Sequence, residues 1–298
     1  MFLKIARKVV HSVRGRRIAA MLGQPQWCKV PAGFWMWIDP KEPLGRITLM
    51  GYLHSELVYF IKQTCRRGDV CVDIGANQGY ITLHMARIVG KEGRVVAIEA
   101  VKPTFERLSA NIQRNHMEQV HCIHRAAGDC TKTLEIWYDP NDTGLASVYN
   151  RATETSARVE VFQEPADVIL ARTLSPSQLS KLVLIKIDVE GYEPIVLKGL
   201  RQTLHQYRPL LWTEKNSHFL QKGGFTISHL INPLRELGYS IYNIHFQRNQ
   251  FLGIPKITLT PADIRSEHFC TEHADIVAVA PGSEGWKRLQ QSSIIMIE

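Results

Sequence analysis

The chain has 298 residues, of which 45% are hydrophobic and 21% are charged, values that suit one large α/β domain and exclude a disordered or fibrous protein. The formal net charge of +8 is concentrated in residues 1–38, which hold seven Lys and Arg and no acid, so the remaining 29 bases nearly balance 28 acids. Nucleic acid is therefore an unlikely partner, because a protein that follows a phosphate backbone needs clustered basic residues beside its working surface.

The N-terminal residues 2–14 place apolar side chains on one face of a helix and basic side chains on the other. Such a helix can lie on an anionic membrane surface or act as a mitochondrial transit segment, and a solvated leader helix fits the pattern equally well. The six cysteines show no C-x-x-C pair and no zinc-binding spacing, which indicates a reduced compartment. We therefore expect a cytoplasmic protein, with peripheral membrane contact through the basic N-terminal helix as an open alternative.

The pattern predicts three regions: a basic leader with an aromatic- and Pro-rich segment (1–44), a central α/β domain (45–285) and a C-terminal tail (286–298). Residues 27–49 are typical of short strands and turns that form a lid or an edge. Short β-branched runs then alternate with amphipathic stretches, which predicts a Rossmann-like, seven-stranded, mostly parallel sheet with helices on both faces. The expected strands are 69–74, 94–99, 120–124, 183–188, 209–214, 239–243 and 274–280. The expected helices are 56–65, 79–90, 103–115, 192–205 and 228–237.

Residues 128–181 interrupt this alternation and predict a hairpin insertion. It would stand over the ligand cleft and shape substrate choice, although an inert surface loop fits the sequence equally well.

The first candidate site is the turn Gly75, Ala76, Asn77, Gln78 and Gly79, which follows Asp73 at the end of a hydrophobic strand and opens a helix. Gly75 and Gly79 let the backbone turn tightly, and the helix N-terminus offers unpaired N–H groups to a carboxylate. Asp73 is expected to accept a hydrogen bond from a ligand ammonium group. Glu99, at the end of the next strand, is expected to accept both ribose hydroxyls. Together these residues predict a site for S-adenosylmethionine.

A nicotinamide or flavin dehydrogenase is the nearest rival, because it shares the βαβ unit and an acid at a similar distance. Its fingerprint is G-x-G-x-x-G, and here Asn77 occupies the position of the second glycine, where its side chain would crowd a pyrophosphate.

The second candidate site lies at the tip of an apolar strand, where Lys186 is followed by Asp188 and Glu190. A buried ammonium group without an acidic partner is costly, so we expect Lys186 to pair with Asp188, Glu190 or Glu214.

At these residues the sequence resembles the FkbM-type methyltransferases. The matching segments read DVCVDIGANQGYITLHMARIVGKEGRVVAIEA, IKIDVEGYEPIVLKGL and RPLLWTE, and the resemblance covers roughly residues 54–215. It implies a class I methyltransferase fold, S-adenosylmethionine as the methyl donor, and O-methylation of sugars, polyketides or related natural products. Ala100 departs from the family, which commonly has proline after the ribose-binding acid.

Transfer of a methyl group to a hydroxyl needs a group that takes up the hydroxyl proton. Asp188 is the first candidate because it also faces the cofactor, with Glu190 and Glu214 as alternatives and His218 next. Glu190 could instead cap a helix and Glu214 could pair with Lys186. No metal site is assigned, although the three acids together would suit Mg²⁺. Glu56 is expected to close over the cofactor, unless it is an ordinary surface acid.

The sequence thus predicts an S-adenosylmethionine-dependent O-methyltransferase acting on a small-molecule or glycan hydroxyl. The alternatives are a peripheral membrane adaptor that retains the fold, and a methyltransferase for protein or nucleic acid. The acceptor and the oligomeric state stay open.

Overall fold

The computed structural model describes residues 23–51, 53–140, 142–149, 156–248, 255–293 and 295–297. The basic helix expected at residues 2–14 lies outside the described residues. Within the described part of the chain, no helix is both long and apolar enough to cross a membrane.

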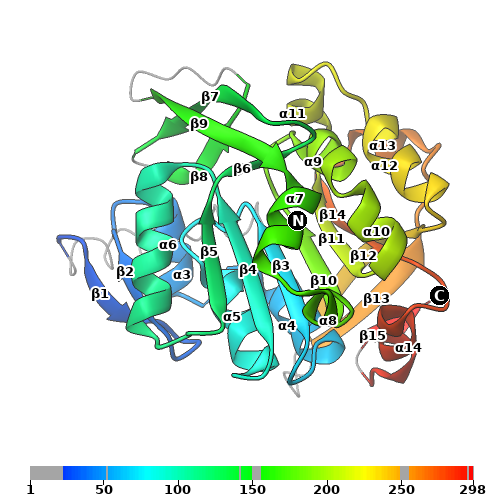
Figure 1. Ribbon diagram of the computed structural model, residues 1–298, viewed down its shortest axis with the longest axis horizontal. Helices are drawn as coiled ribbons and strands as arrows, with labels where there is room; N and C mark the ends of the chain where they lie inside the picture. Colours follow the sequence, from blue (N-terminus) through cyan, green and yellow to red (C-terminus); the bar gives the residue numbers. More distant parts are fainter. Residues whose placement is uncertain are drawn as a thin grey trace.

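A large mixed sheet runs through the centre of the molecule in the order β15-β13-β12-β14-β11-β10-β3-β4-β5 (Figure 1). Its strands are β3 (Val70–Ile74), β4 (Arg94–Glu99), β5 (Val120–His124), β10 (Leu182–Ile187), β11 (Leu210–Lys215), β12 (Ser240–Arg248), β13 (Pro255–Pro261), β14 (Ala274–Val279) and β15 (Ile295–Ile297). The strands from β5 to β11 are parallel, whereas β14 and β12 are antiparallel to their neighbours. This confirms the expected α/β class and the mostly parallel sheet.

The sheet has nine strands in the described residues, so the expected number of seven is wrong. The two additional strands, β13 and β15, extend the edge beyond β12. Proline begins and ends β13, and β15 has three residues, so neither carries a strong strand signal. The expected tail 286–298 therefore contributes to the sheet, and its Leu289 and Ile295 are buried in the core.

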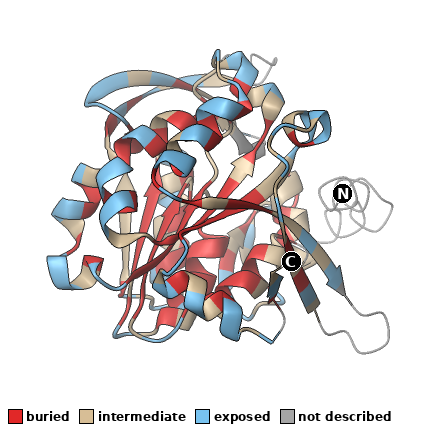
Figure 2. Ribbon diagram, turned by 90° about the vertical axis from the view of Figure 1, so that its right-hand side faces the viewer, coloured by how far each residue is buried: buried red, intermediate tan, exposed pale blue. Residues whose placement is uncertain are grey.

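Helices cover both faces of the sheet, as expected, and Figure 2 shows the buried strands between more exposed helices. One core includes α4 (Ser55–Thr64), α5 (Tyr80–Val89), α6 (Lys102–Arg114) and α14 (Glu284–Gln291). The other includes α7 (Ala166–Thr173), α8 (Pro176–Leu179), α9 (Glu193–Gly199), α10 (Arg201–Tyr207), α11 (Ser217–Lys222), α12 (Ile227–Glu236) and α13 (Glu267–Thr271). Successive strand residues point to opposite faces, so Cys71 packs in the first core and Val72 in the second.

The single helix expected over 192–205 is two helices, α9 and α10, that meet at Leu200. A Cβ on Gly199 would overlap the carbonyl oxygen of Gly128, so the chain passes here directly against the strand that follows β5.

The N-terminal segment forms a hairpin of β1 (Gln26–Lys29) and β2 (Trp35–Ile38) and then a helix, α3 (Pro43–Leu49). The helix was not expected in this region of strands and turns, although Pro43 is favourable at its start. Buried Glu42 accepts hydrogen bonds from Arg107 of α6 at 2.5 Å and from Gln78 at 3.0 Å. These bonds hold the start of α3 beside the glycine-containing turn.

The insertion is a four-stranded sheet in the order β6-β9-β7-β8, followed by α7 and α8. Its strands are β6 (Ala126–Gly128), β7 (Lys132–Asp139), β8 (Asp142–Ser147) and β9 (Ala157–Pro165). In Figure 1 this small sheet stands at one end of the central sheet, and α3 contacts β8. The two elements therefore enclose that end from both sides.

Candidate functional site

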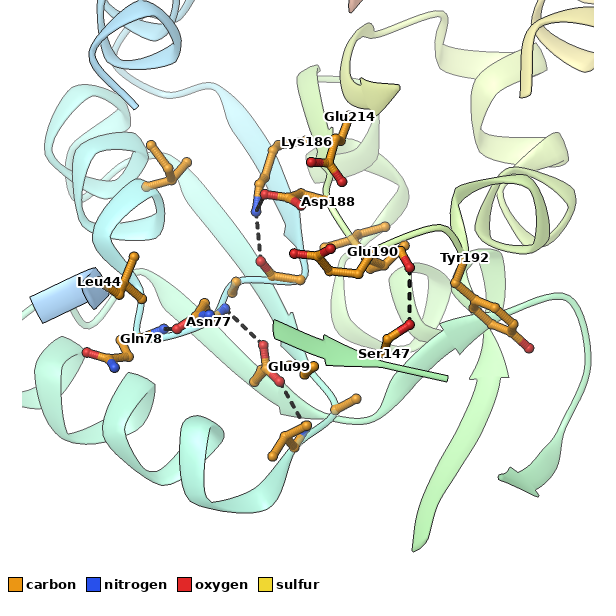
Figure 3. A pocket seen from close by; sticks show the side chains of 18 of the residues that line it. Leu44, Asn77, Gln78, Glu99, Ser147, Lys186, Asp188, Glu190, Tyr192 and Glu214 are labelled. Atoms are coloured by element: carbon orange, nitrogen blue, oxygen red, sulfur yellow. Dashed lines mark hydrogen bonds and ion pairs between the residues drawn. The ribbon is translucent and has the colours of Figure 1, made fainter. Parts of the chain in front are cut away.

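A cavity of about 590 Å³ opens at the carboxyl ends of β3, β4, β10 and β11. The chain order of the sheet reverses between β3 and β10, and ligands of doubly wound sheets bind at such a switch point. Leu44 and Ile47 of α3 line the cavity on one side, and Ala146 and Ser147 of the insertion line it on another. In Figure 3, Asn77, Gln78 and Glu99 lie on one side of the cavity, and Lys186, Asp188, Glu190 and Glu214 lie on the other.

The glycine-containing turn is formed by residues that adopt left-handed backbone conformations, with φ of 75° at Gly75, 49° at Asn77 and 87° at Gly79. A Cβ on Gly75 would overlap the carbonyl oxygen of Asp188, and one on Gly79 would lie 2.6 Å from Leu108 of α6. Both glycines thus permit close packing of protein segments. Gly75, Ala76 and Asn77 line the cavity, whereas Gly79 begins α5 behind them.

Glu99 is the best-positioned polar group on this side of the cavity. Its two carboxylate oxygens accept hydrogen bonds from the backbone N–H groups of Asn77 and Val101, each at 2.9 Å (Figure 3). Burial raises the pKa of Glu99, and these two backbone donors oppose the shift. A carboxylate has about four acceptor positions, so Glu99 retains acceptor capacity for a ligand hydroxyl.

Asp73 lies on β3, two residues before Gly75, and is fully buried. Its carboxylate accepts a hydrogen bond from Thr82 of α5 at 2.6 Å and lies 3.2 Å from the ammonium group of Lys186. It does not line the cavity. Its side chain points to the face of the sheet that α5 covers, and its expected contact with a ligand ammonium group stays a prediction.

Lys186 lies across from Asp73 on the neighbouring strand β10 and donates a hydrogen bond to the carbonyl oxygen of Gly75 at 2.7 Å (Figure 3). Burial opposes its charge, but Asp73 and then Asp188 raise the pKa of Lys186 overall. Of the expected acidic partners, Asp188 lies 3.6 Å from the ammonium group. The strongest contacts, those with Asp73 and Gly75, were not expected.

The opposite side of the cavity, which we term the acidic end, is formed by Asp188, Glu190, Glu214 and Asp275. One carboxylate oxygen from each of the first three lies within 4.8 Å of the others, a spacing that a divalent cation could bridge. Metal dependence stays an open prediction. Burial and the charges of Asp188 and Glu214 raise the pKa of Asp275 to about 7, so this end of the cavity disfavours further negative charge.

Glu214 at the end of β11 accepts a hydrogen bond from Nε2 of His273, which lies 2.5 Å from Oε1. His273 directly precedes β14, the antiparallel neighbour of β11, and both side chains line the cavity. Hydrogen bonding to a carboxylate orients an imidazole and stabilises its protonated form. The pair can therefore take up a proton from a hydroxyl group.

Two residues of the segment before β3 also face the cavity. Glu56 lies in the first turn of α4 and lines the cavity, as expected. His54 precedes α4 with a left-handed φ of 45°, and burial lowers its pKa, so its imidazole is neutral.

Glu190 has φ of 55° and its carbonyl oxygen accepts a hydrogen bond from Ser147 at 3.2 Å. The N-cap of α9 is Tyr192, so Glu190 does not cap this helix.

Comparison with known proteins shows to which family the chain belongs. Residues 73–241, more than half of the chain, match the Methyltransferase FkbM domain. The chain belongs to the FkbM methyltransferase family. The match begins at Asp73 and includes the glycine-containing turn, Glu99, Lys186 and the three acids of the acidic end that precede β14.

Curated relatives cover shorter parts of this FkbM methyltransferase. Protein-L-isoaspartate O-methyltransferase of Triticum aestivum is 30% identical over 88 residues, which are 29% of this chain and 38% of the relative. Hexuronic acid methyltransferase AglP of Haloferax volcanii is 24% identical over 150 residues, 50% of this chain and 57% of the relative. The match thus spans 38% of the first relative and 57% of the second.

Among solved structures, a methyltransferase FkbM from Methylobacillus flagellatus is 15% identical, with a TM-score of 0.41, and the match covers 80% of this chain and 54% of that one.

As a member of the FkbM methyltransferase family, the protein uses S-adenosylmethionine as its cofactor. The residues present fit its polar groups: Glu99 keeps acceptor positions for the ribose hydroxyls, and the backbone of Gly75, Ala76 and Asn77 borders the cavity beside it. Several residues that sequence reasoning missed also line the cavity, namely His54, His273 and Asp275. The position of His273 directly before the expected strand at 274–280 was the one available signal for it.

Proposed function

We propose that this FkbM methyltransferase transfers a methyl group to a hydroxyl oxygen of a sugar, glycan or related natural product. The observation that carries the proposal is the Glu214–His273 pair, whose 2.5 Å hydrogen bond places a proton-accepting group at the acidic end of the cofactor cavity. A hydroxyl is a weak nucleophile at neutral pH, so a positioned base has a role here that transfer to a neutral amine does not require.

The remaining polar groups divide the work of the site. Glu99, Gly75, Ala76 and Asn77 would hold the cofactor, and Glu56 would close over it from α4. When bound, the cofactor supplies an electrophilic methyl group on a sulfonium. The methyl–sulfur bond would break as the acceptor oxygen takes the methyl group, a neutral thioether would leave, and the Glu214–His273 pair would take up the hydroxyl proton.

Asp188 was the first candidate for the base on sequence grounds, but its position favours a different role. Its carboxylate lies 3.6 Å from Lys186, which provides a counter-charge, and its N–H donates to the carbonyl oxygen of Ile74 at 3.1 Å. Asp188 thus fixes the loop after β10 against the glycine-containing turn. We assign it to positioning beside the cofactor and Glu214 with His273 to proton uptake.

A sugar acceptor is supported by the similarity to a hexuronic acid methyltransferase and by the many carboxylates, which can accept hydrogen bonds from several hydroxyls. The similarity to isoaspartate methyltransferases makes a protein carboxylate the second candidate. A carboxylate, in a protein or on a hexuronic acid, would meet repulsion from Asp188, Glu190 and Glu214, so the geometry favours methylation of a neutral sugar hydroxyl.

The test is incubation of the protein with methyl-labelled S-adenosylmethionine and a panel of acceptors: neutral oligosaccharides, hexuronic acid glycosides, an isoaspartyl peptide and transfer RNA. We expect label in the carbohydrate fractions as alkali-stable ethers. The control is Glu99→Ala, which should bind the cofactor about tenfold or more weakly by titration calorimetry, because it removes hydrogen bonds to a charged acceptor. Label confined to peptide or RNA, or alkali-labile methyl esters, would exclude the proposed acceptor class.

A further inference from the structure

The β1–β2 hairpin has two chemically different faces. Cys28, Met36 and Ile38 pack against the core from its inner face. Cross-strand partners share a face, and Trp27 pairs with Trp37 while Lys29 pairs with Trp35. We term these four residues the hairpin outer face. In Figure 1 the hairpin lies at the margin of the molecule beside α6.

The hairpin outer face combines indole rings with cations. Trp35 is 38% exposed, Lys29 is exposed, and Trp27 and Trp37 are half-buried. Exposed Arg114 of α6 extends the face, since its guanidinium lies 5.8 Å from the ring centre of Trp27 and 5.3 Å from that of Trp35. None of these five residues is acidic.

Rigid contacts hold the aromatic residues in place. The side chain of Asn115 accepts a hydrogen bond from the backbone N–H of Trp35 at 2.9 Å and donates to the carbonyl oxygen of Trp35 at 2.6 Å. The side chain of Asn111 accepts from the backbone N–H of Trp37 at 2.8 Å, and the rings of Trp27 and Trp37 meet edge to face with centres 5.6 Å apart. The backbone of the hairpin is therefore held against α6, and the ring contact restricts Trp27 and Trp37, which lowers the entropy lost when the face binds a surface.

The chain that enters β1 continues the same chemistry in its sequence. Residues 1–22 hold six Lys and Arg and no acid, interspersed with apolar residues that include Phe2, Leu3, Ile5, Val9 and Val13. This segment joins the hairpin only three residues before β1. The sequence that directly precedes the hairpin therefore has the composition that an anionic surface attracts.

We propose that the hairpin outer face docks on an anionic membrane surface. Tryptophan is favoured at the membrane–water boundary because its ring is apolar and its N–H is polar, and Lys and Arg beside it can reach anionic headgroups. Met36 on the inner face lines the cofactor cavity, so docking on the outer face leaves that cavity uncovered. The inference is independent of the proposed acceptor.

The test is cosedimentation of the full chain with phosphatidylcholine vesicles that contain about 30% phosphatidylserine, compared with phosphatidylcholine alone. We expect binding to the anionic vesicles that weakens as salt is raised, with a blue shift of the tryptophan fluorescence. The paired substitution Trp27→Ser and Trp35→Ser should lower the partition coefficient roughly tenfold, because it removes two interfacial rings. Lys29→Glu should also lower it while leaving the rings in place.

The matched control is Phe162→Ser on β9. Phe162 is 43% exposed and lies 5.2 Å from the guanidinium of Arg125, so it is an exposed aromatic residue with a cation partner on another face. It should bind vesicles like the unchanged protein. The proposal is overturned if Lys29→Glu and folded Trp27→Ser/Trp35→Ser bind like the unchanged protein, or if the unchanged protein binds neither vesicle. It is also overturned if the same substitutions abolish binding to a soluble polyanion such as heparin while vesicle binding persists.

Discussion

The ammonium group of Lys186 lies 3.2 Å from the carboxylate of Asp73, and the two residues are register partners on adjacent parallel strands. Both side chains are buried, with 5% and 0% of their surface exposed. The same ammonium group donates to the carbonyl oxygen of Gly75, so this pair fixes the backbone of the glycine-containing turn that borders the cofactor cavity. Two residues 113 positions apart in the chain thus determine the shape of one turn.

Replacing Lys186 by Met should lower the free energy of unfolding by about 3–5 kcal/mol, because the buried charge of Asp73 loses its partner. Chemical denaturation measures the change. The double variant Lys186→Met/Asp73→Asn should recover part of the loss. Arg67→Met provides the control, since its pair with Glu92 is exposed on both sides and should contribute little. Equal effects of Lys186→Met and Arg67→Met would contradict this account.

Sequence reasoning identified both members of the Lys186–Asp73 pair as site residues but did not pair them with each other. It expected Lys186 to pair with Asp188, Glu190 or Glu214, of which Asp188 lies 3.6 Å from the ammonium group, and it assigned Asp73 to a ligand. Partner choice depends on strand register, which places Lys186 level with Asp73 and has no local signal in the sequence.

Glu99 shows why a strand-end acid can be predicted correctly. Ile98 is level with Ile74, so Glu99 extends one residue beyond the level of β3 and reaches the cavity. Asp73 is level with Ala97, two residues further inside the sheet than Glu99, and its side chain meets Thr82 of α5. The fold class, the strands of the FkbM region and the acidic loop followed from local patterns. The edge strands β13 and β15 and the position of His273 beside Glu214 depend on long-range pairing, which those patterns do not encode.

The Glu214–His273 pair leads to a prediction about turnover. Substituting His273→Gln retains a group that can donate to Glu214 but cannot accept a proton, so kcat should fall roughly 100-fold or more. The affinity for S-adenosylmethionine should remain within about twofold, because the cofactor-binding turn and Glu99 lie on the other side of the cavity.

Chemical rescue separates a catalytic from a structural role for His273. Added imidazole should restore part of the turnover of His273→Ala, which has room for it, and not that of Glu99→Ala. The kcat–pH profile of His273→Gln should also differ from that of the unchanged protein, and the other acids and histidines that line the cavity, namely Glu56, Asp188, Glu190, Asp275, His54 and His218, are present in both proteins. Full activity of His273→Gln at every pH would remove His273 from the mechanism.

Loss of activity on chelation of divalent cations, with restoration by Mg²⁺, would favour a metal role for Asp188, Glu190 and Glu214 instead.

Glu193 leads to a prediction about stability and pH. One of its oxygens accepts backbone hydrogen bonds from Val189 and Gly191, and burial, followed by the charge of Glu214, raises its pKa from 4.5 to about 8. Between these two values the folded protein retains a proton that the unfolded chain releases, so stability falls as the pH rises through this window and levels off above it. Glu193→Gln keeps the acceptor oxygen and lacks this loss.

The melting temperature of the unchanged protein should therefore decrease relative to that of Glu193→Gln between about pH 5 and about pH 8, by about 2–4 °C for each kcal/mol of lost stability. Asp275, whose pKa is raised to about 7, contributes in the same direction to both proteins and cancels in the difference. If the melting temperatures of the two proteins, plotted against pH, run parallel across this range, the pKa of Glu193 is not raised in the folded protein.

Gly75 and Gly224 form a matched pair that tests how tightly the cofactor turn packs. Both have positive φ, 75° and 73°, so alanine pays a similar backbone cost of about 1 kcal/mol at either position. A Cβ at Gly75 would overlap the carbonyl oxygen of Asp188, whereas no heavy atom lies within 4 Å of a Cβ at Gly224. Gly75→Ala should therefore destabilise the protein by several kcal/mol more than Gly224→Ala, and should also weaken cofactor binding, because the turn and the loop of Asp188 must move apart. Urea unfolding and titration calorimetry on the two variants measure both effects. If the two alanine variants proved equally stable and bound the cofactor equally well, the close approach of the turn to Asp188 would not be a requirement of this fold.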